Sequence, residues 1–150
     1  MPGADMTSPT ILSVGYEGRT LDEIVSTLIR HRVQVLVDVR LTAVSRKKGF
    51  SKASLATALD GANIGYRHEP SLGNPKDNRE AFRQGSKAAR KRFERHLANG
   101  ARSRYSATVE LARNSRVALF CFEREHSECH RSCIADRAQS EEPGFTVLEI

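Results

Sequence analysis

The chain has 150 residues, of which 39% are hydrophobic and 28% are charged, a composition typical of a globular protein in water. No apolar run approaches the roughly 20 residues of a membrane-spanning helix, so no contact with a membrane is predicted. The start, MPGADMTSPT, lacks the basic and apolar parts of a secretory signal. Three cysteines without such a signal favour reduced thiols and a cytoplasmic location over a disulfide framework.

The net charge of +6 is unevenly distributed along the chain. Residues 76–104 contain ten Lys or Arg and three Asp or Glu, so the remainder is close to neutral. A basic segment of this kind either contacts phosphates or forms a solvated helix face.

The first half of the chain alternates between strand and helix patterns. Residues 1–9 indicate a disordered tail, and 10–150 indicate a single α/β domain. The apolar run 11–16 predicts a buried strand, and Thr20 and Glu23 form a capping-box pattern in front of an amphipathic helix. The nearly continuous apolar run 33–40 is typical of a central parallel strand.

The second half continues the alternation. Ser51 is expected to cap a further helix, which leads to a short strand at 66–68. One long basic helix then carries Phe82, Ala89, Phe93 and Leu97 on one stripe, and it ends at Asn99-Gly100. After another helix, a buried strand at 116–123, a helix from His130 and a last strand in PGFTVLEI complete the chain.

This order predicts a three-layer, Rossmann-like α/β fold. We expect a mainly parallel sheet of about five strands with right-handed crossovers and helices on both faces. In such sheets, ligands bind beyond the carboxyl ends of the strands. The polar residues that follow predicted strands are therefore candidates for one site: Tyr16, Asp38, Arg40, Arg46, Glu123, Cys129, His130, Arg131 and Ser132.

Three arginines in this set are candidate anion ligands. The planar fork of Arg40 suits phosphate or carboxylate, and Arg131, with Ser132 beside it, follows at a helix start where backbone N–H groups face outward. Arg46 shares its loop with two lysines, so simple solvation explains it equally well. Asp38 either serves the site or caps the loop that follows its strand.

Cys129 is a candidate nucleophile. A thiolate at a helix start beside His130 and Arg131 is favoured by the helix dipole and by positive charge. The alternative is a small buried side chain that packs the turn against the sheet. For Cys121 and Cys133, packing is the favoured interpretation.

Two neighbours of Cys129 can assist chemistry. Glu123 is a candidate general base or ribose ligand, and the plain alternative is a salt bridge to Arg40 or Arg131. His130 either transfers protons near neutral pH or donates a hydrogen bond to a backbone carbonyl.

The cysteine spacing does not predict a metal or cofactor. Cys121, Cys129 and His130 give a C-x7-C-H spacing without a second ligand pair, whereas structural zinc normally needs four ligands. A rhodanese-type substrate loop is also disfavoured, because HRSCIAD after Cys129 contains no glycine and indicates a helix.

Together, several segments resemble the domain of unknown function 488 family: SVGYEGRTLDEIV, LVDVR, SRKKGFSKASLATAL, IGYRHEPSLGNP and ALFCFEREHSECHRSCIAD. The resemblance covers about residues 11–150 and implies a compact α/β domain without supplying a reaction. Its motif positions correspond to Gly15, Asp38, Arg40, Ser45, Arg46, Phe50, Tyr66, Leu72, Gly73, Cys121, Glu123, Cys129, His130, Arg131 and Ser132.

Three functions remain open from the sequence. The favoured one is an enzyme or binding domain for a phosphate-containing small molecule or nucleotide, served by the Cys/His/Arg/Glu cluster. The second is a nucleic-acid module whose phosphates contact Arg79, Arg83, Lys87, Lys91 and Arg95. The third is a partner-binding or structural domain in which the polar cluster is a buried network.

Overall fold

The structure is a computed structural model that describes residues 9–150. Residues 1–8 of the predicted tail lie outside the described residues. At Pro9 the chain is already next to the sheet, because its carbonyl accepts a hydrogen bond of 2.9 Å from the backbone N–H of Thr146.

Five strands form one parallel sheet with the order β3-β2-β4-β1-β5. The predicted three-layer, parallel α/β fold is confirmed. The strands are β1 (Thr10–Gly15), β2 (Val35–Asp38), β3 (Gly65–His68), β4 (Val117–Cys121) and β5 (Thr146–Glu149).

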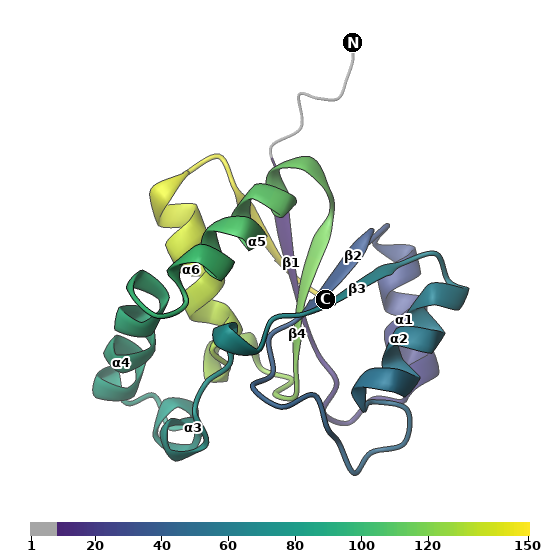
Figure 1. Ribbon diagram of the computed structural model, residues 1–150, viewed down its shortest axis with the longest axis horizontal. Coiled ribbons are helices and arrows are strands. Elements are labelled where there is room, and N and C mark those ends of the chain that lie inside the picture. Colours follow the sequence, from purple (N-terminus) through teal and green to yellow (C-terminus); the bar gives the residue numbers. More distant parts are fainter. Residues whose placement is uncertain (1–8) are drawn as a thin grey trace.

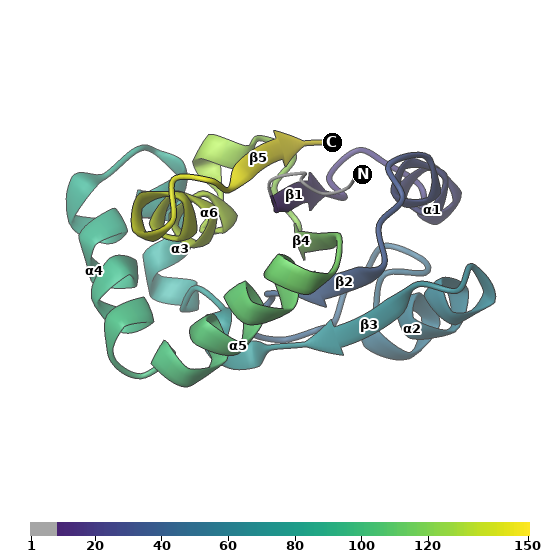
Figure 2. The ribbon, with the colours of Figure 1, turned by 90° about the horizontal axis from the view of Figure 1, so that it is seen from above.

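Helices cover both faces of the sheet (Figures 1 and 2). The chain moves one way along the sheet from β1 to β3 and the other way from β3 to β5. Because such crossovers are right-handed, this reversal places the first two helices and the last four on opposite faces. The helices are α1 (Leu21–Arg30), α2 (Lys52–Gly61), α3 (Lys76–Arg83), α4 (Lys87–Ala98), α5 (Arg102–Asn114) and α6 (Arg131–Glu141).

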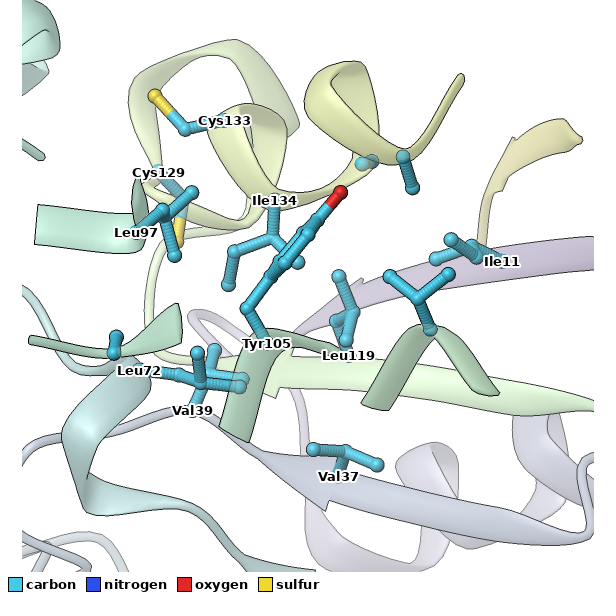
Figure 3. Close-up of a cluster of buried hydrophobic side chains, with 14 of the residues drawn as sticks. Ile11, Val37, Val39, Leu72, Leu97, Tyr105, Leu119, Cys129, Cys133 and Ile134 are labelled. Atoms are coloured by element: carbon cyan, nitrogen blue, oxygen red, sulfur yellow. The ribbon is translucent and has the colours of Figure 1, made fainter. Parts of the chain in front are cut away.

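Successive residues of the central strands enter two separate hydrophobic cores. On β4, Leu119 packs in the core beneath α3 to α6, whereas Phe120 packs in the core beneath α1 and α2. This alternation follows from the two-residue period of a strand. Figure 3 shows part of the first core, where Leu119, Tyr105 and Ile134 lie between the sheet and the helices.

The helix starts follow the sequence signals in one case and depart from them in another. Thr20 and Glu23 form the predicted capping box, with bonds of 3.1 and 2.8 Å between each side chain and the other's backbone N–H. Ser51 occupies the predicted N-cap of α2, but its hydroxyl bonds the backbone of Ser45 instead.

The prediction of one long basic helix is wrong, because α3 ends at Arg83 and α4 begins at Lys87. Gly85 takes a φ of +84°, a left-handed conformation that glycine adopts at low cost. Ser86 then caps α4 by accepting a bond of 3.2 Å from Ala89 N–H. The break places Arg79 and Arg83 on a different helix from Lys87, Lys91 and Arg95, so the five cations share no single face.

Within the described part of the chain, the helices are too short or too polar to cross a lipid bilayer.

Candidate functional site

A cavity of about 170 Å³ opens at the carboxyl ends of the central strands. Its wall combines residues that follow β1, β2 and β4 with residues of α3 and of the turn before α6. The lining residues are Tyr16, Arg40, Leu41, Thr42, Val44, Asn74, Arg79, Arg83, Cys121, Phe122, Glu123, Glu128, Cys129 and His130. The strand-end rule therefore located the cavity from the sequence.

The thiol of Cys129 and the ring of His130 form a close pair in the cavity wall. Cys129 Sγ lies 3.6 Å from His130 Nδ1. The other ring nitrogen, Nε2, lies 2.8 Å from the carbonyl oxygen of Val39, which only accepts hydrogen bonds. Nε2 therefore carries a proton, and the ring presents Nδ1 to the sulfur.

Burial and charge act in opposite directions on these groups. Burial disfavours a thiolate at Cys129, but the hydrogen bond from Cys121 and the charges of His130 and Arg131 outweigh it and hold its pKa well below the usual value. The same contact with Cys129, together with burial, holds the pKa of Cys121 well above its usual value. Burial opposes protonation of His130, but the Cys129 sulfur raises its pKa.

All three cysteines pack in the core beneath α3 to α6, and Cys129 and Cys133 are each only 1% exposed. Cys121 and Cys129 also line the cavity, whereas Cys133 does not, and burial raises the pKa of the Cys133 thiol to about 12. Figure 3 shows the sulfur atoms of Cys129 and Cys133 pointing in different directions. Cys121 and Cys133 both pack in the core, as the sequence suggested, and Cys121 also lies in the cavity wall beside Cys129.

Glu123 connects the cysteines to α3. One carboxylate oxygen lies 3.7 Å from Cys121 Sγ, and the other accepts bonds of 3.2 and 3.0 Å from Arg83. Burial and the nearby Cys129 sulfur raise the pKa of this carboxyl group. The suggested salt bridge to Arg40 or Arg131 is therefore formed by Arg83 instead.

Close backbone contact at the end of β1 positions Glu123. A Cβ atom added to Gly15 would lie 1.9 Å from the carbonyl oxygen of Glu123, closer than any non-bonded atoms approach. Only glycine at this strand end allows the segment after β4 to cross so closely over β1.

Arg40 and Asp38 form a buried salt bridge at 2.7 Å, with Asp38 fully buried. Arg40 also donates to the carbonyl of Phe50 at 2.7 Å, and Tyr66 Oη donates to Asp38 at 2.6 Å. Most donors of Arg40 are thus directed at protein acceptors, although the residue lines the cavity. The prediction that Asp38 caps the loop after its strand is partly confirmed, because one of its carboxylate oxygens accepts a hydrogen bond from the backbone N–H of Arg40.

Arg131 and Ser132 lie behind the cavity wall rather than in it. Arg131 is 1% exposed, and it donates to Ser13 Oγ and to the carbonyl of Glu123, each at 2.7 Å. Ser132 donates to the carbonyl of Cys129 and accepts from Arg90.

The structure thus brings together five of the nine candidate residues in the cavity wall: Tyr16, Arg40, Glu123, Cys129 and His130. Asp38, Arg131 and Ser132 support these residues from outside the wall, and Arg46 is exposed on its loop. Sequence reasoning assigned Arg79 and Arg83 to a nucleic-acid surface and missed their place in the cavity. The Gly-Ser pair at 85–86 was the available signal for a break in the basic segment, because Gly85 follows the end of α3 and Ser86 caps α4.

Three of the cavity residues can bind a metal ion. Cys121 Sγ, Cys129 Sγ and a ring nitrogen of His130 all lie within 4.8 Å of one another, and all three residues are buried.

Comparison with known families agrees with the motif resemblance. Residues 20–138 match the profile described as "Domain of unknown function DUF488", which covers most of the chain. The chain therefore belongs to this family, whose description assigns no activity. No curated protein and no solved structure matches the chain.

The buried Asp38–Arg40 pair generates a stability prediction. Replacing Arg40 with Leu leaves Asp38 charged, buried and without its ion partner, which costs about 3–5 kcal/mol in comparable pairs. Urea unfolding monitored by circular dichroism measures the change. The matched control is Arg46→Leu, an exposed arginine six residues along the chain, whose expected effect is within about 0.5 kcal/mol. Equal effects of the two substitutions would contradict the assignment.

Proposed function

We propose that this protein is an enzyme that acts on a small phosphate-bearing molecule through the thiol of Cys129. The observation that carries the proposal is the Cys129–His130 pair in the wall of a cavity that also contains arginine side chains. His130 Nδ1 is positioned to take the thiol proton, and the Val39 carbonyl orients the ring through Nε2. A nucleophile, a base and a group that orients the base are the parts that covalent catalysis requires.

The anion is assigned to Arg79 and Arg83 of α3 rather than to Arg40. Arg79 uses its Nε to bind the carbonyl of Asn74 at 2.9 Å, and no ion pair of Arg79 occurs within residues 9–150. Arg83 is half-exposed and is held at the cavity by Glu123. Both guanidinium groups therefore keep donors for phosphate oxygens.

The cavity rim supports a nucleotide-like rather than a purely inorganic substrate. Leu41, Val44 and Phe122 are exposed and line the same cavity, and an exposed apolar patch of this kind is typical of a ligand-binding surface. Phe122 offers an aromatic ring on which a base can stack. The chemistry needs a reduced thiol, which agrees with the predicted cytoplasmic location, and all three cysteines are free.

A matched pair of alkylating reagents tests this function. Iodoacetate and iodoacetamide attack the same thiol, but only iodoacetate is negatively charged. We expect Cys129 to be modified in the folded, metal-free protein. The ratio of the iodoacetate rate to the iodoacetamide rate should be about fivefold higher in the folded protein than in the unfolded chain, because ~1 kcal/mol of Coulomb attraction favours the charged reagent. Arg79→Ala should reduce the preference, Arg46→Ala should retain it, and inorganic phosphate should slow the reaction. Mass spectrometry locates the modified cysteine.

Two results would contradict the proposal. A Cys129 thiol that reacts only after unfolding excludes a nucleophilic role. Equal preference in the wild type and Arg79→Ala excludes the anion site at α3.

Nucleic-acid binding is the second candidate function, now limited to α4. Lys87, Lys91 and Arg95 are exposed, and none of them forms a salt bridge within residues 9–150. Binding through these residues should weaken steeply with added salt. We expect Lys87→Gln, Lys91→Gln and Arg95→Gln together to reduce the slope of log affinity against log salt by about 2–3. An unchanged slope, or no salt-sensitive retention of DNA or RNA by the wild type, would exclude this function.

A further inference from the structure

Three potential metal ligands converge at the cavity although they are separated in sequence. Cys121 ends β4, whereas Cys129 and His130 precede α6. The segment 122–128 carries the chain away from the sheet and returns it, because Cys129 N–H bonds the carbonyl of His126 in a short 3₁₀ turn. The ligand atoms consequently lie within 4.8 Å of one another.

The ring of His130 is held as a metal-binding histidine is held. Its Nε2 donates to the Val39 carbonyl at 2.8 Å, so in the neutral ring the lone pair is on Nδ1. Nδ1 is also the nitrogen that faces Cys129 Sγ. Metal-binding histidines almost always donate their second ring N–H to a carbonyl or carboxylate, which fixes the tautomer and the ring orientation.

The separations suit a tetrahedral ion. Zinc binds sulfur at about 2.3 Å and imidazole nitrogen at about 2.0–2.1 Å, so tetrahedral ligand atoms lie about 3.4–3.8 Å apart. The distance of 3.6 Å between Cys129 Sγ and His130 Nδ1 falls in this range. Small side-chain movements within the 4.8 Å cluster bring in the sulfur of Cys121.

Charge and access favour the same occupant. Two thiolates neutralise a divalent ion, and sulfur with imidazole selects thiophilic metals such as zinc over magnesium or calcium. All three residues line the cavity, so a fourth coordination position opens toward it. Three protein ligands with one open position are the arrangement of zinc sites that bind water or substrate.

We propose that Cys121, Cys129 and His130 form a three-ligand site for Zn²⁺ or a similar thiophilic divalent ion, open toward the cavity. Both thiols lose their protons to solvent when the ion binds, and His130 binds as the neutral ring. This metal site rests on the proposed function, because both use the sulfur of Cys129. The ion regulates the enzyme: while it is bound to the sulfur, Cys129 cannot attack a substrate.

The experiment adds ZnCl₂ alone to protein that has been stripped with a chelator and kept reduced. Competition with a chromophoric chelator gives the stoichiometry and affinity, and we expect one ion per chain. Cys121→Ala should weaken binding by at least about 10–100-fold, the loss seen when even a hydrogen-bond partner of a ligand is removed. Cys133→Ala, a buried cysteine outside the cluster, is the matched control and should leave the affinity unchanged.

A second readout does not depend on the folding of any variant. Co²⁺ added to the wild-type protein should produce sulfur-to-cobalt charge-transfer absorption and the intense visible bands of tetrahedral coordination. Zn²⁺ should displace it and should block alkylation of Cys129. Absence of thiolate-bound cobalt, or zinc binding that is equal in wild type and Cys121→Ala, would overturn the metal site.

The two proposals fail separately in these measurements. A Cys129 that is reactive in the metal-free protein and unaffected by zinc retains the proposed enzyme and removes the metal site. An inert Cys129 in a protein that binds one zinc ion retains the metal site and removes the thiol enzyme.

Discussion

The arrangement at the sheet edge depends on one fully buried guanidinium group, that of Arg131. It joins the start of α6 to β1 through Ser13 Oγ and to the segment after β4 through the carbonyl of Glu123. Because Ser13 accepts this bond, its own hydroxyl proton is free to bond His126 Nδ1 at 2.7 Å. Charge-assisted hydrogen bonds of a buried side chain thereby hold together elements from distant parts of the sequence.

The proposed chemistry follows from this arrangement. With α6 held against the sheet, His130 contacts the Val39 carbonyl just after β2, and Cys129 faces Cys121 at the end of β4. The same geometry suits both a thiol with a base and a metal ion with three ligands, since each needs a ring nitrogen directed at sulfur. In the thiol enzyme, Nδ1 of His130 takes the proton of Cys129. In the metal site, the ion binds to Nδ1 in place of that proton.

The sequence predicted those features that depend on local pattern. Alternating strands and helices, and the cap at Thr20, follow from periodicity and from side chains that bond nearby backbone groups. The strand-end rule also located the cavity. Contacts between distant segments could not be predicted: the break at Gly85 separates α3 from α4, and Arg83 at the end of α3, rather than a strand-end arginine, pairs with Glu123. For the same reason the proximity of Cys121 to Cys129 could not be predicted, because the return of the chain to the Cys121 sulfur is not a sequence pattern.

The most direct test of this account is the free energy of unfolding of Arg131→Lys, measured with urea. Lysine keeps the positive charge but has a single nitrogen, which does not span Ser13 and Glu123 as the guanidinium does. Hydrogen bonds to charged groups contribute about 1.5–3 kcal/mol each, so we expect Arg131→Lys to lower the free energy of unfolding by at least about 2 kcal/mol. A variant as stable as the wild type to within about 0.5 kcal/mol would contradict the central role of this residue.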